Sequence, residues 1–510
     1  MTATPRCLSR ELGQALPDHF HAVSVSMPKW EHVEKYAVGN HDLHTALRTG
    51  YPRFVYHANN IALNAWWHKH HVNDPSKAVF VLPTWAVAER FQAFLSHSFP
   101  SDSITFESIG VGDAHALIMP TEALNCFRAC WQHGGEITSS RLAERLLESL
   151  NESSHDVEIS MDNTLSHTKL RERIASLYNI PSANVSLYPA GMAAIFNAYR
   201  LLKKLPNKGK TVMFGFPYLD TLKMLRRPEW NSEDIIFYPN GNENDLEELE
   251  GIENINAIFT ELPSNPLLRS PDIARLAVIA HRRDAILIVD DTVGSYNVNV
   301  LKSIDGHAAD IIATSLTKIF SGNATVIGGS LIVNPSSSKA SELLAGLDGQ
   351  SYLYEGDAQT LLDASADIHE RRARVNFNAA IIADRLKAHP LVESIYYPKF
   401  VNTAMYKRYS IEEGDAFGPL LSFIVRGGYD IAKIVYDTFN FAKGPSLGTN
   451  FTLSIPYTIL SHSSEFEYVE SCGVRRDLIR ISIGLEDVEE IWSHFSVALE
   501  KGAIALNSEP

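Results

Sequence analysis

The sequence predicts an α/β fold built on a mostly parallel sheet, because strand-like and helix-like segments alternate between about residues 165 and 340. The apolar runs are short and are separated by helix-sized intervals, which is the pattern of βαβ units. Helices would then cover both faces of the sheet. The expected strands lie at 185–188, 211–214, 235–238, 257–260, 285–290 and 311–313, and the first expected helix lies at 192–202.

The length of 510 residues indicates more than one domain, since a single hydrophobic core rarely serves more than about 250 to 300 residues. We assign residues 1–164 to an N-terminal extension and arm, 165–375 to a large domain and 376–510 to a smaller C-terminal α/β domain. Further expected elements are a strand at 79–82, helices at 86–95 and 138–150, a long helix from about 367 to 382 and a strand at 421–425.

The composition is that of a globular protein, with 45% hydrophobic and 21% charged residues and a formal net charge of -15. Nucleic acids and anionic membranes bind concentrated basic faces, so neither is an expected partner. No apolar run is long enough to cross a bilayer. Four cysteines are too few and too scattered for a disulfide framework, and the N-terminus lacks a secretory pattern. We therefore expect a cytoplasmic enzyme that acts on small molecules.

One histidine-rich stretch, Trp66-Trp67-His68-Lys69-His70-His71, raises the question of a metal site. Consecutive histidines on one element point in different directions, which disfavours coordination of one ion. A helix end that packs its tryptophans and exposes its histidines is the interpretation that we prefer. We therefore predict no metal site.

Lys318 closes a short apolar and hydroxyl-rich run directly after the strand-like residues 310–312. A lysine in that place suits an amine that forms a Schiff base, while the hydroxyls of Ser315 and Thr317 hold a phosphate. The alternative is a solvated surface charge, as most lysines are. Parallel sheets bind ligands outside the carboxyl ends of their strands, and Lys318 lies at such an end.

Other candidate residues follow the neighbouring strands. Asp290 ends the most apolar strand, where a buried carboxylate needs a partner such as a pyridinium N–H; Asp291-Thr292 beside it also fits ordinary helix capping. Gly191 and Met192 open a helix whose N-terminus can hold an anion, or they form a plain turn. Tyr218 can stack on a planar ring or cap the core.

Asn265 lies between two prolines in the stiff loop 261–266, which fixes a polar side chain at the rim of a pocket. A phosphate loop, a stacking aromatic, an acid and a lysine, in this order, are the parts that a pyridoxal 5′-phosphate (PLP) site needs. The combination therefore predicts PLP as the cofactor and Lys318 as its covalent anchor.

These residues also resemble the γ-subfamily of fold-type I PLP-dependent enzymes, which includes cystathionine γ-synthases, cystathionine lyases and O-acylhomoserine sulfhydrylases. The resemblance covers about residues 165 to 500 and implies the PLP-dependent transferase fold type I, with a mostly parallel seven-stranded sheet. The N-terminal part, which includes Arg48-Thr49-Gly50-Tyr51-Pro52-Arg53-Phe54, is similar to the extension of fungal cystathionine γ-synthases. The segments that carry the resemblance are 188–195, 261–267, 289–292, 315–318, 446–448 and 478–487.

The resemblance implies a role for each matching residue. Lys318 and Tyr218 would be catalytic, Lys318 as the anchor of the cofactor and Tyr218 on its ring face. Asp290 would bind the pyridine nitrogen. Arg480, with Ser446 and Asn265 nearby, would bind the substrate carboxylate, a task that suits a bidentate guanidinium. The other implied cofactor-binding residues, which would hold the phosphate, are Gly191, Met192, Ser315 and Thr317.

The implied reaction is a γ-replacement on an O-acylhomoserine. Lys318 would remove the α proton, the γ-acyloxy group would leave after a second deprotonation at the β carbon, and a thiol or a carbon nucleophile would attack Cγ. The alternatives are an elimination of the cystathionine β- or γ-lyase type and a non-catalytic homologue. The resemblance also implies a homodimer or a homotetramer.

A Tyr-x-Arg pair is missing at the place where the resemblance predicts it. In the family this pair reaches the site from the neighbouring subunit, but the corresponding arm here, 153–158, contains neither residue. His155 and Lys169 are the candidates that would take over part of this role.

Overall fold

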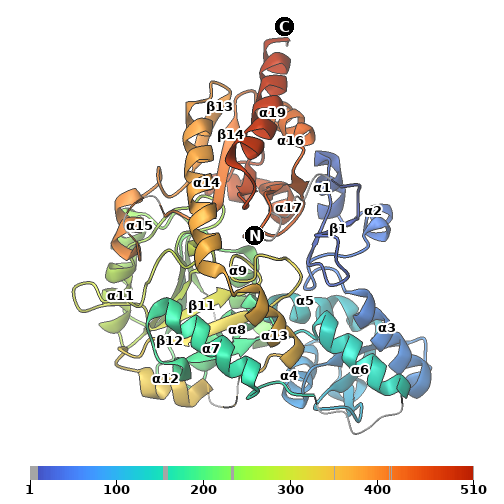
Figure 1. Ribbon diagram of the computed structural model, residues 1–510. Coiled ribbons are helices and arrows are strands. Elements are labelled where there is room, and N and C mark those ends of the chain that lie inside the picture. The colour runs from blue at the N-terminus through green and yellow to red at the C-terminus, as the bar shows by residue number, and fades with distance from the viewer. Residues whose placement is uncertain are drawn as a thin grey trace.

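The computed structural model contains a seven-stranded central sheet with the order β6-β12-β11-β10-β9-β7-β8 (Figure 1). The structure describes residues 10–152, 159–230, 235–347, 349, 351–412, 414 and 416–508. The strands of this sheet are β6 (Val185–Tyr188), β7 (Lys210–Phe214), β8 (Ile236–Tyr238), β9 (Ile255–Glu261), β10 (Ile286–Asp290), β11 (Ile311–Ser315) and β12 (Gly329–Val333).

Every strand of this sheet except β12 runs in one direction, which confirms the predicted α/β class. β10 is parallel to both β9 and β11, and β7 is parallel to both β8 and β9. β12 pairs antiparallel with β11 and with β6. We did not predict β12, because its start at Gly328-Gly329 has the composition of a turn.

Alternate side chains of the strands enter two different cores, as expected for a sheet covered on both faces. Met213, Phe259 and Ile288 pack on the side of α8 (Gly191–Leu202) and α9 (Leu219–Leu225). Residues one position away along the strands, such as Ile258 and Leu287, pack with α7 (Leu165–Tyr178) and α11 (Ile273–His281). The predicted alternation of strands and helices therefore produces the layers.

A second, five-stranded sheet follows with the order β13-β14-β17-β16-β15. The expected long helix is α14 (Ile368–Ala388), and the expected strand at 421–425 is β14. The elements of this part are β13 (Val392–Tyr396), β14 (Leu420–Val425), β15 (Ala442–Lys443), β16 (Leu453–Pro456), β17 (Ile479–Ser482), α16 (Gly428–Thr438), α17 (Tyr457–His462) and α19 (Val488–Ser508).

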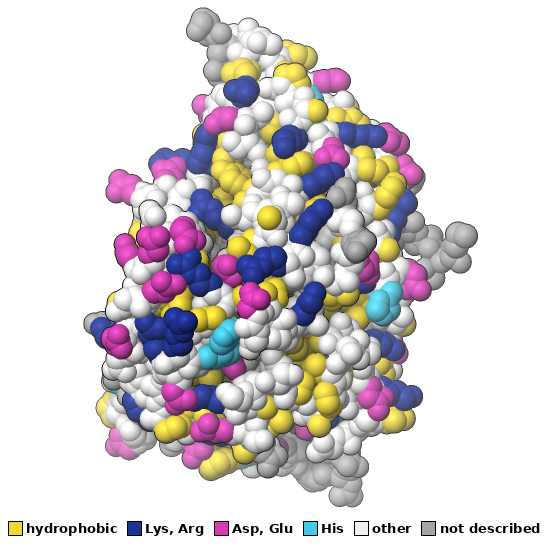
Figure 2. Space-filling view, turned by 90° about the vertical axis from the view of Figure 1, so that its left-hand side faces the viewer, with side chains coloured by type: hydrophobic (Ala, Val, Ile, Leu, Met, Phe, Trp, Pro, Cys, Tyr) yellow, Lys and Arg dark blue, Asp and Glu magenta, His cyan; other side chains and the backbone are white. Residues whose placement is uncertain are grey.

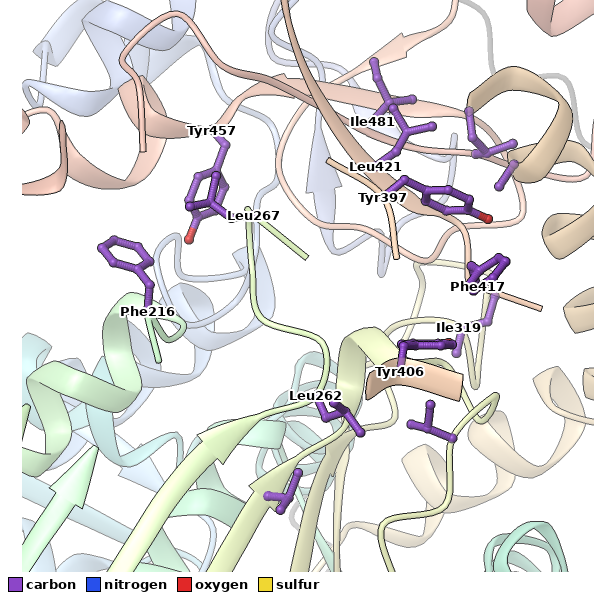
Figure 3. Close-up of a cluster of buried hydrophobic side chains, with 14 of the residues drawn as sticks. Phe216, Leu262, Leu267, Ile319, Tyr397, Tyr406, Phe417, Leu421, Tyr457 and Ile481 are labelled. Carbon is purple, nitrogen blue, oxygen red and sulfur yellow. The ribbon is translucent and has the colours of Figure 1, made fainter. Parts of the chain in front are cut away.

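One continuous hydrophobic core joins the two sheets (Figure 3). Phe417 contacts Tyr397 and Tyr406, with ring centroids 5.8 and 5.5 Å apart. Ile319, which follows the predicted anchor Lys318, and Leu421 of β14 belong to the same cluster. The packing therefore fixes the end of the large sheet against the smaller part. Our division of the chain into domains at residues 165 and 376 stays a prediction.

The N-terminal 150 residues contain a three-stranded antiparallel sheet of their own, with the order β3-β5-β4. The expected strand and helix near residues 79 and 95 are confirmed as β3 and α4, and the expected helix at 138–150 is α6. The elements are α3 (Ala58–Trp67), β3 (Lys77–Leu82), α4 (Trp85–Leu95), β4 (Thr105–Ser108), β5 (His115–Pro120), α5 (Leu124–Gly134) and α6 (Ser140–Glu152).

Residues 10–57 form a segment that we call the N-terminal strap, because it runs along the side of the molecule next to both larger parts (Figure 1, dark blue). The amide of Val23 donates to the carbonyl of Ala324 over 2.8 Å, and the amide of Met27 donates to the carbonyl of Lys443 over 2.8 Å. Trp30, at the start of α1 (Trp30–Ala37), is fully buried and donates from Nε1 to the Tyr429 hydroxyl over 2.9 Å.

The histidine-rich stretch at residues 66–71 is the end of a helix with a buried tryptophan and exposed histidines, which is the arrangement that we predicted. Trp67 is buried at the end of α3, while His70 and His71 are exposed and stack on Trp66 and Trp67 with centroids 4.3 and 3.8 Å apart. Within the described ranges, no group of three or more His, Cys, Asp or Glu side chains is arranged to hold a metal ion.

The surface charges and the lengths of the helices bear on the question of nucleic-acid and membrane partners. On the face shown in Figure 2, basic and acidic side chains are interspersed and do not separate into one large basic patch. No helix in the described part of the chain combines the length and apolarity that a membrane crossing requires.

We predict that Trp30→Ala destabilises the protein by about 3–5 kcal/mol, because it removes a fully buried aromatic side chain and its hydrogen bond. Thermal unfolding and limited proteolysis of the strap would measure the effect. The matched control is Trp85→Ala, since Trp85 is 48% exposed. Equal shifts in the unfolding midpoint for both variants would contradict the anchoring role of Trp30.

Candidate active site

A pocket of about 350 Å³ lies at the carboxyl ends of the parallel strands, where the large sheet, the smaller part and the N-terminal strap meet. All but one of the ten site residues that we predicted from the sequence line this pocket. They are Gly191, Met192, Tyr218, Asn265, Asp290, Ser315, Lys318, Ser446 and Arg480. The chain therefore brings together residues that lie up to 289 positions apart (480 minus 191).

Lys318 follows the end of β11 and points its amine at the smaller part. Nζ donates a hydrogen bond to the Ser446 hydroxyl over 2.9 Å. Burial lowers the pKa of the Lys318 amine below its ordinary value; the charges of Arg480 and Arg53 lower it further, while Tyr51 raises it. A lysine amine with a lowered pKa spends more time neutral, which is the form that attacks a carbonyl carbon.

Two carboxylates end neighbouring strands at the pocket. Asp290 of β10 lies opposite Glu261 of β9 in the parallel register, and the Thr292 amide donates to Asp290 Oδ1 over 2.9 Å. Burial raises the pKa of Asp290, and burial together with the charge of Asp290 raises the pKa of Glu261. A cationic N–H group beside Asp290 would lower the cost of its negative charge, which is what a pyridinium nitrogen provides.

A small polar niche is formed where α8 begins. Gly191 is the first residue of α8, and the preceding Ala190 provides no side-chain cap for the helix N–H groups. A Cβ atom at Gly191 would lie 2.7 Å from Cβ of Ser315. The buried Ser315 hydroxyl has no hydrogen-bond partner among the described residues. A helix N-terminus, a glycine and an unpaired hydroxyl together fit a phosphate group.

Thr317 is the predicted residue that does not line the pocket. Its hydroxyl donates to the Gly328 carbonyl over 3.4 Å and accepts from the Gly328 amide over 3.1 Å. These bonds join the turn after β11 to the residue before β12. The predicted contact of Thr317 with the phosphate therefore stays a prediction, and the structure gives its hydroxyl a different partner.

Arg480 of β17 is buried in the pocket wall next to two of the other predicted residues. Its guanidinium donates to Asn265 Oδ1 and to the Ser446 carbonyl, both over 3.0 Å, and lies 4.6 Å from the ring centroid of Tyr457. Burial lowers the pKa of Arg480 to about 10, although it remains charged near neutral pH. Among the described residues Arg480 has only neutral acceptors, so this group is well suited to bind a carboxylate.

Tyr218 lies at the start of α9 and is part of a buried network that the sequence analysis missed. Its hydroxyl accepts from Arg53 Nη2 over 2.5 Å and donates to Asp220 Oδ2 over 3.2 Å. Arg53 Nη1 also donates to Asp220 Oδ2 over 2.8 Å. Arg53 and its neighbour Tyr51 belong to the N-terminal strap and line the pocket.

Tyr51 and Arg53 could have been found from their spacing in the sequence. Tyr51-Pro52-Arg53 has the Tyr-x-Arg spacing that we looked for in the arm at 153–158. His155, one of our substitutes, lies outside the described residues. Lys169, the other one, lies on α7 and lines a different hollow with Leu165 and Arg173, not the pocket of Lys318.

Comparisons with known proteins agree with this fold. A solved cystathionine γ-synthase from Xanthomonas oryzae, in complex with cystathionine, superposes with a TM-score of 0.58 over 67% of this chain and 87% of that chain at 22% identity. The fold is therefore that of the fold-type I PLP-dependent enzymes. The model of the Cys/Met metabolism PLP-dependent enzymes matches residues 138–500, and the chain belongs to this family.

Relatives match nearly the full length, including the N-terminal part. A cystathionine γ-synthase from Neurospora crassa is 31% identical over 96% of this chain and 98% of that protein. A cystathionine γ-synthase-like enzyme from Amanita muscaria is 30% identical over 96% of this chain and 97% of that protein. PLP is the cofactor of this family, and the niche beside Ser315, the acid Asp290 and the amine of Lys318 fit its phosphate, ring nitrogen and aldehyde.

We predict that Gly191→Ala weakens PLP binding at least tenfold, because the added Cβ would lie 2.7 Å from Ser315 Cβ and occupy the niche. The dissociation constant of PLP, measured by absorbance or by fluorescence quenching, would test this. The control is Gly134→Ala, where an added Cβ would have its nearest neighbour at 3.6 Å. Unchanged PLP affinity in Gly191→Ala would exclude this niche as the phosphate site.

Proposed function

We propose that this protein catalyses a PLP-dependent γ-replacement on an O-acylhomoserine, with a thiol or a carbon nucleophile as the second substrate. The observation that carries the proposal is that Ser446 connects the two key cations. Its hydroxyl accepts from Lys318 Nζ over 2.9 Å, and its carbonyl accepts from Arg480 over 3.0 Å. A reactive amine and a carboxylate-binding group therefore lie on either side of one residue, as recognition of an α-amino acid requires.

Each of the residues around the pocket would have a different role in the reaction. Bound PLP supplies an electron sink that stabilises negative charge on the substrate carbon next to its nitrogen. Asp290 would hold the ring nitrogen in its protonated form, and Tyr218 would cover the ring face. Lys318 Nζ would take the proton from Cα and give it back to the conjugated system of the bound substrate and cofactor. The amine, neutral again, would then take the proton from Cβ as the acyloxy group leaves Cγ. It would return a proton to carbon after the nucleophile has bonded to Cγ.

The outer part of the pocket supports a substrate with a long side chain. The lining includes Tyr36 and the serines 461, 463 and 464, which come from the N-terminal strap and from the region of α17. Lys223 and Ser464 are exposed and mark the mouth. A γ-acyloxy group and a second substrate would both enter through this mouth, and Lys223 provides a positive charge for an anionic group there.

The proposal has two further parts. We infer that the chain acts in the cytoplasm on amino-acid substrates and that it assembles as a homodimer or a homotetramer. Size-exclusion chromatography with light scattering would measure the assembly, and a monomer at micromolar concentration would contradict it.

The reaction is tested by incubating the PLP-loaded protein with O-acetylhomoserine or O-succinylhomoserine and one nucleophile at a time: cysteine, sulfide or a stabilised carbanion such as a β-keto ester. Mass spectrometry would identify the product with the new bond at Cγ. Release of a keto acid and ammonia from cystathionine alone would assign a lyase instead. Absence of product with every pair would exclude the proposed γ-replacement.

We predict that Arg480→Lys lowers kcat/KM for the amino-acid substrate by about 10- to 100-fold, mainly through KM, because a lysine cannot form the bidentate bond to a carboxylate. The matched control is Arg475→Lys, in the same part of the chain, whose side chain is 40% exposed and pairs with Asp477. Steady-state kinetics of both variants would measure the difference. A loss of similar size in Arg475→Lys would show that Arg480 has no special part in substrate binding.

A further inference from the structure

Glu261 is a buried carboxyl group that lines the pocket, and the reaction proposed above gives it no role. We propose that Glu261 is a positioning residue: one of its oxygens holds Tyr218 against the cofactor ring, and the other holds Asn265 in the place from which Asn265 orients Arg480. The inference rests on the PLP-dependent function proposed above and deepens it. One side chain would then fix the position of the substrate carboxylate relative to the cofactor ring.

The carboxyl group of Glu261 bonds to two separate segments of the pocket wall. Oε1 accepts from the Tyr218 amide over 2.5 Å, and Oε2 accepts from the Asn265 amide over 3.3 Å. Tyr218 directly precedes α9, and Asn265 lies in the loop after β9. The two bonds therefore join the start of α9 to that loop through a side chain that is 5% exposed.

The loop at residues 262–266 has few other ways to fix the backbone of Asn265. Two of its residues are prolines, which have no N–H group to donate. The other two amides before Asn265 donate to backbone carbonyls over 3.0 and 2.8 Å. The Asn265 amide donates to the Glu261 carboxyl group instead. Since a buried N–H group needs an acceptor, this bond determines where the Asn265 side chain begins.

Asn265 connects this loop to the group that binds the substrate carboxylate. Its Oδ1 accepts from Arg480 over 3.0 Å, and its Nδ2 donates to the Tyr457 hydroxyl over 3.3 Å. The Tyr457 ring centroid lies 4.6 Å from the same guanidinium. All three side chains are at most 5% exposed. A displacement of the Asn265 backbone would therefore move both groups that orient Arg480.

The place is unfavourable for a second carboxyl group unless both of its oxygens are needed. Glu261 lies opposite Asp290 in the parallel register, and burial and the charge of Asp290 raise the pKa of Glu261. Its two described partners are neutral amides. A glutamine of the same shape would avoid the repulsion, but its Nε2 cannot accept a hydrogen bond. Two amides that need acceptors explain why a glutamate occupies this position.

The first test compares two probes that differ only in a carboxylate, L-homoserine and 3-aminopropan-1-ol. The change in the visible band of the PLP-loaded protein gives both dissociation constants. In Glu261→Gln we expect the single oxygen to keep the shorter bond to Tyr218, so that the bond to Asn265 is lost. Affinity for L-homoserine should then fall about tenfold, and affinity for the amine should change less than about twofold, because Arg480 binds only the carboxylate. An equal change for both probes, or no change, would overturn the link to Arg480.

The matched control for this comparison is Glu486→Gln. Glu486 is 8% exposed, accepts from the Thr452 amide over 2.6 Å and lies outside the described lining of the pocket. We expect less than about a twofold change for either probe in this variant. A selective loss of L-homoserine affinity in the control would contradict the inference. If Glu261→Gln does not fold, Glu261→Asp takes its place, because the shorter side chain keeps the charge and cannot reach both amides.

The second test concerns the cofactor and compares Glu261→Ala with Glu261→Gln. The alanine variant loses both bonds and releases Tyr218, so we expect its affinity for PLP to fall at least about tenfold. The glutamine variant keeps the bond to Tyr218, so its affinity for PLP should stay within about threefold of the wild type. Fluorescence quenching by PLP measures both values, with Glu486→Ala as the control. Equal PLP affinity in the alanine variants at positions 261 and 486 would overturn the link to Tyr218.

The third test combines Glu261→Gln with Arg480→Lys. If Glu261 acts through Arg480, the two effects on L-homoserine affinity do not multiply. The double variant should then bind L-homoserine within about threefold of Arg480→Lys alone. A double variant whose loss equals the product of the two single losses would show that Glu261 acts independently of Arg480, and it would overturn the inference.

These readouts separate failure of this inference from failure of the proposed function. None of them requires turnover, so they apply even if the γ-replacement is wrong. If the wild type binds L-homoserine no better than the amine, Arg480 does not bind a carboxylate and the proposed function fails. If the wild type prefers L-homoserine and Glu261→Gln keeps the full preference, the function stands and the positioning role of Glu261 is excluded.

Discussion

The pocket depends on buried ionisable groups for which no salt bridge is formed within the described residues, although the charge of Lys318 partly offsets the effect of burial on the pKa of Asp290. Arg480 donates only to the neutral oxygens of Asn265 and Ser446, and Lys318 Nζ donates to a serine hydroxyl. Asp290 is a carboxylate whose pKa is raised by burial. Removing one partner from a buried ion pair costs about 3–5 kcal/mol, so unpaired charges are retained where a ligand supplies the partner. A ligand with a protonated ring nitrogen and a carboxylate would supply an opposite charge to Asp290 and to Arg480.

The sheet and most of the pocket follow from local sequence patterns, because each of these residues lies next to an element with its own signal. The strands that end at Asp290 and Glu261, and the strand before Lys318, are apolar runs bounded by polar residues. Parallel strands bring their carboxyl ends to one edge, so identifying the strands also places the side chains that follow them. The direction of β12 could not be predicted in this way, because it depends on pairing with β6 and β11 and not on the residues of β12 itself.

The N-terminal contribution cannot be derived in the same way. Tyr51 and Arg53 lie in an irregular stretch between α2 (His41–Ala46) and α3, without an apolar period that would predict its path. The bond from Arg53 to Asp220 spans 167 positions and exists only because α5 places Gln132 and Trp131 beside the strap. The Tyr-x-Arg spacing itself is visible in the sequence. The two residues could therefore be found from the sequence, but their position in the folded structure could not.

The strap has a mechanical consequence for the enzyme. The strap is bonded to both parts of the chain that line the pocket: to Lys443 through Met27 and to Ala324 through Val23. Arg53 then ties the same segment to Asp220 at the pocket wall. Any movement of the smaller part therefore pulls on the segment that positions Tyr51 beside Lys318. The N-terminal region forms part of the wall of this pocket, so a change that loosens the strap would also move side chains that line the pocket.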